Sequence, residues 1–145
     1  MDTAIGKCYE YSLGSRSYEI SIMYLSFFFK KMTQLAKLER IGLTWTEVVF
    51  MQVFVSNMAD FGVVNGAYKG FFGINPPPRA CVGANLPKPY RIQVSCTAIR
   101  KDAVPARPRQ TLHVQGMSYW APANIGPYSQ ASEVSACEPV VIIPI

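Results

Sequence analysis

The stretch from Asn57 to Ala98 constrains the fold most, because it contains a helix whose two ends are both marked in the sequence. Asn57 is a good N-cap residue, and Asp60 places a carboxylate in the positively polarised first turn. Gly73 and the three prolines that begin at Pro76 mark the end, so the helix is predicted to stop by about Phe72. Apolar residues at spacings of three and four predict one buried helical face: Met58, Phe61, Val64, Tyr68, Phe71 and Phe72.

Three glycines within this helix, Gly62, Gly66 and Gly70, are spaced by four and therefore share one side. Each costs about 1 kcal/mol of helix propensity relative to alanine. A helix accepts that loss most readily where its backbone lies close against a sheet. We therefore expect the glycine side of the helix to face a sheet.

Two strands are predicted after the prolines. Arg79 is followed by a short run from Ala80 to Ala84, a turn around Pro87 and a longer run from Tyr90 to Ile99. Every second residue of the longer run shares one face, which is typical of a strand with a buried side: Tyr90, Ile92, Val94, Cys96 and Ala98. Helix, loop, short strand, turn and long strand make half of an α+β domain.

The rest of the chain divides into segments of different character. Residues 1–29 form an uncertain N-terminal segment. Residues 1–17 are expected to be a frayed leader or one weak strand, and Tyr18 to Leu25 is a possible strand. Apolar residues at helical spacing predict an amphipathic helix over residues 27–41, closed at Gly42. Val48 to Val55 is almost wholly apolar, as expected for a central strand covered on both faces. Residues 101–110 are charged and proline-punctuated, which indicates a linker.

Composition argues against several classes of function. The net charge is +5, but the basic residues are scattered and no RNA-binding aromatic motif or zinc-finger spacing accompanies them, so no nucleic-acid partner is expected. The four cysteines lack CxxC spacing and His113 is the single histidine, so no metal or other cofactor is expected. The apolar run from Ile20 to Phe29 is roughly half a membrane span. No membrane contact is expected, and the cytoplasm is the expected compartment.

The motifs, taken in order, resemble the C-terminal half of a RidA/YjgF (reactive-intermediate deaminase) domain. The resemblance rests on NMADFGVVNGAYKGFF, PPPRACV, NLP and RIQVSCTAI, between Asn57 and Ile99, and extends back to about Met32. It implies an α+β fold, a chorismate-mutase-like sheet backed by two helices, over residues 30–100. SYWAPANIGPYSQA, residues 118–131, resembles the opening of such a domain. Residues 111–145 are therefore expected to be the truncated start of a second, partial copy.

A tandem of such domains resembles the C-terminal region of the eukaryotic diphthine–ammonia ligase family. In that family an ATP-binding domain precedes the pair, and the enzyme amidates diphthine on elongation factor 2 with ATP and ammonium. This chain has no SGGKDS-type phosphate loop, so the resemblance implies a fragment that is not catalytic alone and contributes assembly or small-ligand binding. The implied partners are further copies of the chain in a trimer-like oligomer, a small carboxylate, and elongation factor 2 through the parent protein.

Arg79 and Tyr128 are the candidate ligand-binding residues. Arg79 directly follows a rigid proline run, and its guanidinium suits a carboxylate. In RidA-like deaminases the matching arginine holds the substrate carboxylate in a cleft between subunits, and a tyrosine matching Tyr128 lies near that cleft. The alternatives are an arginine that bonds loop carbonyls or a neighbouring subunit, and a core tyrosine whose hydroxyl meets a backbone carbonyl. The two residues belong to different copies, so their meeting requires domain or subunit pairing.

Ser95 marks a departure from the deaminating members of the family, which carry there a glutamate that helps position the attacking water. Serine does not serve as a general base near neutral pH without a neighbouring base, and nothing in the sequence places His113 beside it. No catalytic residue is therefore predicted. A stand-alone enamine/imine deaminase of the RidA type, or an inactive truncated product, are the alternative functions.

Assembly is the last expectation from the sequence. The N-terminal hairpin that normally completes such a sheet is not recognisable, so open strand edges are expected. Residues 111–131 are expected to cover part of an edge, on their own sheet or on a neighbouring chain. Either arrangement would bring Tyr128 towards Arg79.

Overall fold

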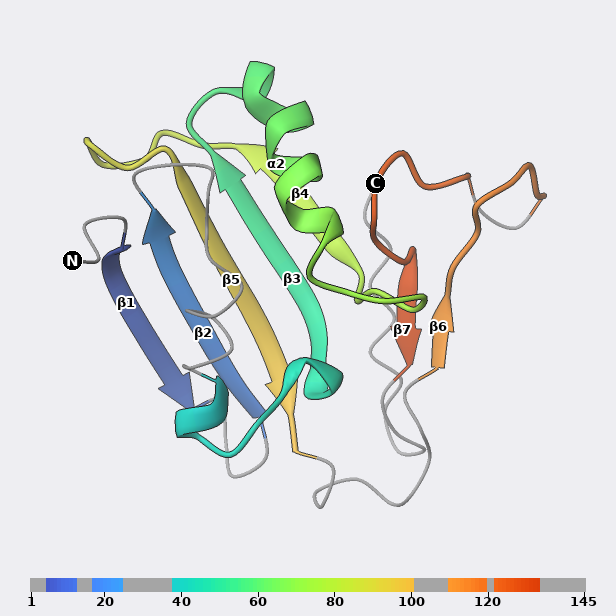
Figure 1. Ribbon diagram of the computed structural model, residues 1–145, viewed down its shortest axis with the longest axis horizontal. Helices are drawn as coiled ribbons and strands as arrows, with labels where there is room; N and C mark the ends of the chain where they lie inside the picture. Colours follow the sequence, from blue (N-terminus) through green and yellow to red (C-terminus); the bar gives the residue numbers. More distant parts are fainter. Residues whose placement is uncertain (1–4, 13–16, 25–37, 101–109, 120–121, 134–145) are drawn as a thin grey trace.

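The computed structural model describes residues 5–12, 17–24, 38–100, 110–119 and 122–133 of the 145-residue chain (Figure 1). Five strands form one mixed sheet in the order β1-β2-β5-β3-β4. All neighbouring strands are antiparallel except β3 and β4, which run parallel and are connected through helix α2. The helix lies over one face of the sheet (Figure 1). The bounds are β1 Ile5–Ser12, β2 Ser17–Tyr24, β3 Val48–Val55, α2 Phe61–Lys69, β4 Arg79–Gly83 and β5 Ile92–Ile99. This architecture confirms the α+β class.

The N-terminal segment supplies a hairpin of two strands, and the expectation that the hairpin is missing is wrong. β2 pairs with β5 along its whole length, from Ser17 opposite Ile99 to Tyr24 opposite Ile92, and β1 pairs with the other side of β2. β1 is an edge strand. Edge strands often carry polar and charged residues, which weakens the alternation by which a strand is recognised in a sequence.

The core lies between α2 and the sheet face that the helix covers. Val64 and Tyr68 of α2 are fully buried, and Phe71 follows them in the next turn. The predicted buried face of the long strand is confirmed for Ile92, Val94, Cys96 and Ala98, which all belong to this core. Such close packing of apolar side chains is the main stabilising contribution to a domain of this size.

Strand β3 is covered fully on one face, which corrects the expectation of two covered faces. Val48, Met51, Val53 and Val55 are buried against the helix side, whereas Phe50, Gln52 and Phe54 are only half-buried on the other face. The central position in the sheet belongs to β5. An apolar run cannot by itself show which layers cover a strand.

The end of the first helix carries the expected glycine signal. Residues 38–40 are the described end of the first helix, while residues 27–37 of the predicted helix lie outside the described ranges. Leu43 N donates to Leu38 O at 2.8 Å and Gly42 N to Glu39 O at 3.0 Å, which is the Schellman pattern. Gly42 has φ +74°, a conformation that favours glycine.

The second helix begins as predicted and stops before Phe72, as predicted. Asn57 Oδ1 accepts a hydrogen bond from Ala59 N at 3.0 Å, one 3₁₀ turn (η2, Met58–Asp60) follows, and α2 ends at Lys69. The glycine at its end is Gly70 and not Gly73. Gly62, Gly66 and Gly70 face outward, and a Cβ at any of them would meet nothing within 4 Å. The expectation that they face the sheet is therefore wrong, because Val64 and Tyr68 occupy that side.

The segment beyond the linker folds back within the same chain. β6 (Gln110–Leu112) and β7 (Ala131–Glu133) pair as a separate two-stranded sheet beside the loop before β4 (Figure 1). Ser129 ties this segment to the proline run, because its backbone forms a parallel bridge with Pro78 and its Oγ donates to Pro76 O at 2.5 Å. The segment therefore covers the start of β4.

Candidate functional site

Arg79 begins β4 on the sheet face that packs against α2, and only 2% of it is exposed. Its guanidinium carbon lies 4.5 Å from the centre of the Tyr68 ring and 5.8 Å from that of Phe61. Its Nη2 donates to Asn65 Oδ1 at 2.6 Å. The helix and the proline run therefore hold one cation in an aromatic enclosure, a geometry in which cation–π attraction contributes.

The guanidinium of Arg79 is incompletely satisfied. No carboxylate of the described residues forms an ion pair with it, and its Nε and Nη1 are buried without a hydrogen-bond partner there. Burial lowers the pKa of Arg79, and the neighbouring Tyr68 acts in the opposite direction. An arginine nevertheless stays protonated in proteins. Arg79 is therefore a buried cation with N–H donors that have no acceptor among the described residues.

Tyr128 lies beside Arg79, so the structure brings the two predicted residues together within one chain. The centre of the Tyr128 ring is 5.2 Å from the guanidinium carbon. Gly126 permits this approach, since a Cβ there would come within 3.1 Å of Arg79 Nη2 and 3.3 Å of Asn65 Oδ1. Residues 126–128 therefore cover the guanidinium with backbone and an aromatic ring.

Ser95 lies on the opposite face of the sheet from Arg79. Met51 is paired with both Arg79 and Cys96, so Ser95, one residue before Cys96, points to the other side. Its hydroxyl is buried and donates to Ser21 Oγ at 2.8 Å, and Gln93 Nε2 donates to the same oxygen at 2.9 Å. No base is present in these contacts.

His113 and Cys81 do not supply a nucleophile–base pair. His113 lies within hydrogen-bond distance of Gln115 and of Ser129, away from Ser95. Burial raises the pKa of the Cys81 thiol, with Arg79 acting in the opposite direction, so this thiol is protonated at neutral pH. Within the described ranges there is no group of three residues suited to metal binding, and no helix there is long and apolar enough to cross a membrane.

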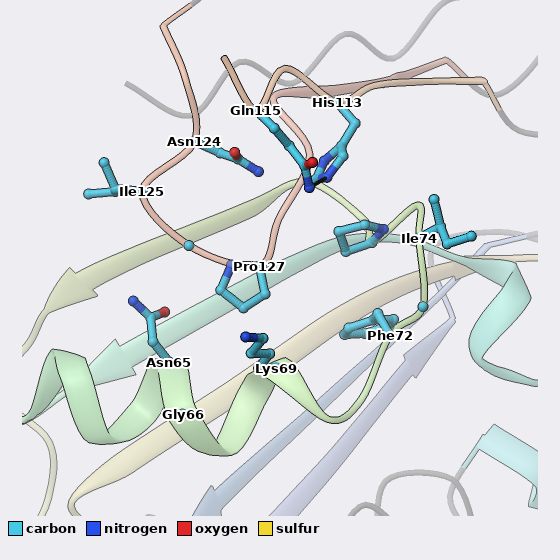
Figure 2. A pocket seen from close by; sticks show the side chains of 13 residues that line it. Asn65, Gly66, Lys69, Phe72, Ile74, His113, Gln115, Asn124, Ile125 and Pro127 are labelled. Atoms are coloured by element: carbon cyan, nitrogen blue, oxygen red, sulfur yellow. Dashed lines mark hydrogen bonds between the residues drawn. The ribbon is translucent and has the colours of Figure 1, made fainter.

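A cavity of about 740 Å³ opens beside this arginine, between α2 and the folded-back segment (Figure 2). Asn65, Gly66 and Lys69 line it from the helix, and His113 and Asn124 from the segment. Neither this cavity nor Asn65, which joins it to Arg79, was predicted from the sequence. The available signal was an asparagine within an otherwise apolar helical pattern.

A mixed sheet with a parallel β3-α2-β4 unit and an arginine directly after a proline run defines a RidA-like α+β domain. Residues 29–100 match the endoribonuclease L-PSP family, so this part of the chain is a domain of the RidA type. The structure resembles the crystal structure of the YjgF gene product of Escherichia coli, with a TM-score of 0.54 and 24% identity over 63% of this chain and 85% of that one. This likeness shows the fold.

Two kinds of curated relatives are similar in sequence. A diphthine–ammonia ligase of Schizosaccharomyces pombe is 48% identical over 91 residues, which are 62% of this chain and 14% of that protein. The 2-iminobutanoate/2-iminopropanoate deaminase of Escherichia coli is 37% identical over 70 residues, 46% of this chain and 55% of that protein. The chain thus spans a small part of the ligase and about half of the deaminase.

Proposed function

We propose that this chain is a non-catalytic RidA-like region of a protein of the diphthine–ammonia ligase type, in which it contributes assembly and the binding of a small carboxylate. The observation that carries the proposal is Ser95. A buried hydroxyl that donates to Ser21 occupies the position at which the deaminating members hold a water-positioning carboxylate. A neutral serine without a base cannot replace that carboxylate.

Sequence similarity supports the ligase context. The match to the Schizosaccharomyces pombe ligase is both longer and closer than the match to the Escherichia coli deaminase. In such a parent protein, elongation factor 2 would be the substrate of the amidation, and this region would act away from the ATP chemistry. Cytoplasmic location is part of the same proposal.

The unused donors of Arg79 support carboxylate binding. A buried guanidinium with two unpartnered nitrogens gains charge-assisted hydrogen bonds when a carboxylate reaches it. Residues 126–128 cover it in this conformation, so we infer that a ligand at Arg79 displaces part of that cover.

Hydrolysis of 2-aminoacrylate to pyruvate and ammonium is the direct test. We expect no pyruvate above the non-enzymatic rate, with the Escherichia coli deaminase as the positive control. The alternative, a stand-alone deaminase of the RidA type, is favoured by the retained Arg79 and Tyr128. Turnover by this chain that disappears in Arg79→Met would establish that alternative and reject the non-catalytic function.

A further inference from the structure

The cavity beside α2 has walls of two kinds. Side chains from the helix and the loop after it form one wall, and His113, Gln115 and residues 124–127 form the other (Figure 2). Its volume of about 740 Å³ falls within the range of pockets that hold small organic molecules. Arg79 does not line it.

The charge of the lining is one-sided. Lys69, in the last turn of α2, is the only charged residue among those that line the cavity, and no aspartate or glutamate accompanies it. Arg79 lies directly behind Asn65 and also has no carboxylate partner within the described ranges. Two cations with no counter-ion in the described part of the chain favour an anionic occupant.

Asn65 adds an oriented donor to this lining. Its Oδ1 accepts from Arg79 Nη2 at 2.6 Å, which fixes the amide so that Nδ2 is the group left to bind elsewhere. Nδ2 makes no hydrogen bond to another described residue. An anion at Lys69 would therefore find a second donor one helical turn away, since Asn65 and Lys69 are four residues apart.

The remaining lining is apolar. Phe72 and Pro76 contribute from one wall, and Ile125 and Pro127 from the other. Ile74 and Ile125 are 89% and 79% exposed at the rims, although isoleucine is a residue that normally gains from burial. Each therefore offers apolar surface to an occupant with an apolar body.

We propose that this cavity binds a small organic anion with an apolar body, such as an aromatic or branched aliphatic carboxylate. The anionic group is held by the ammonium of Lys69 and the amide of Asn65, and the body packs between Phe72 and Ile125. This site is separate from the carboxylate site proposed at Arg79 and is formed jointly by the domain and the folded-back segment.

The first test compares 4-fluorobenzoate with 4-fluorobenzamide, which has the same shape and no charge, by fluorine NMR titration of the full chain. We expect the benzoate to bind about tenfold more tightly, the effect of one charged hydrogen bond. Lys69→Met should remove this preference. Lys88→Met, at an exposed lysine in the turn before β5, is the matched control and should leave it unchanged.

A pair of glycine variants tests the location. Gly66 and Gly62 lie one turn apart on α2, and a Cβ added at either would meet no atom within 4 Å. Of the two, only Gly66 lines the cavity. In an Arg79→Met background, which removes the other proposed carboxylate site, Gly66→Leu should abolish benzoate binding and Gly62→Leu should preserve it. The inference is overturned by equal binding of the two probes, or by a Gly66→Leu variant in this background that still binds.

Arg79→Met separates this inference from the proposed function. We expect Arg79→Met to retain the preference for benzoate to within about threefold, because Arg79 acts here only through Asn65. If Arg79→Met loses binding while Lys69→Met binds normally, the anion binds at Arg79. That result refutes the cavity site and keeps the proposed function. Pyruvate formation from 2-aminoacrylate would instead refute the proposed function and leave the cavity site standing.

Discussion

At the scale of single residues, Arg79 is held at a cost to stability. Burial disfavours its charge, only one of its nitrogens has a partner among the described residues, and no carboxylate there offsets the lost hydration. Removing a buried charge in favour of an apolar residue of similar size is often neutral or stabilising. We therefore propose that Arg79 serves binding more than folding.

Arg79→Met is accordingly expected to raise the free energy of unfolding by about 1 kcal/mol, because methionine fills the same space without a charge to desolvate. Urea denaturation of the full chain measures this. Arg91→Met is the control, since Arg91 is half-exposed in its ion pair with Asp60 and should change stability by less than about 0.5 kcal/mol. If Arg79→Met instead lowers the free energy of unfolding by more than about 1 kcal/mol, Arg79 stabilises the fold and the expectation is wrong.

At the scale of elements, α2 carries more glycine than its packing requires. Gly62 and Gly66 lie in the helix interior with open space around them, whereas Gly42 ends the preceding helix at positive φ. Gly62 and Gly66 weaken the helix, whereas Gly42 adopts a backbone conformation that is strained for other residues.

Gly62→Ala and Gly66→Ala should each stabilise the chain by roughly 0.5–1 kcal/mol, since alanine restricts the unfolded chain and meets no atom in the folded one. Gly42→Ala should destabilise it by about 1 kcal/mol. Thermal melts followed by circular dichroism distinguish the two directions. Destabilisation by Gly62→Ala would mean that the outer side of α2 is packed in solution.

The elements that the sequence predicted are those with a strong local signal. The N-cap at Asn57, the alternation of the long strand and the Gly42 terminus each depend on neighbours in the chain. The region of β1 was left open between a frayed leader and a weak strand, and the glycine side of α2 was wrongly predicted, because both depend on what packs against them. The same holds for the site: Arg79 followed from its proline run, whereas the cavity is formed by two segments separated by 37 positions, from Pro76 to His113.

At the scale of the whole molecule, one face of the sheet lacks a described helix. Phe50 and Phe54 of β3 are half-buried there, beside the polar cluster of Ser21, Gln93 and Ser95. Aromatic side chains on an otherwise polar strand surface are suited to association. We propose this face as the contact between copies in a trimer-like oligomer.

Phe54→Glu should therefore shift the chain to the monomer in light scattering, because it places a charge within that contact. Val63→Glu is the control on the outer side of α2, where the valine is 54% exposed, and should leave the mass unchanged. Melting curves of both variants check that the fold persists. A wild-type chain that is monomeric at micromolar concentration would reject this contact.

The cover over Arg79 also has a temporal consequence. Tyr128 follows Ile99, the last residue of the sheet, by 29 positions, so the ribosome completes the domain before it makes the aromatic lid. At about 5–20 residues per second, translation of that interval takes roughly 1.5–6 seconds. During synthesis the guanidinium therefore faces solvent for a period that the finished chain does not repeat. We expect a nascent chain that is stalled when about 110 residues have left the exit tunnel to react with arginine-specific reagents at Arg79. The completed protein should protect Arg79 from the same reagents.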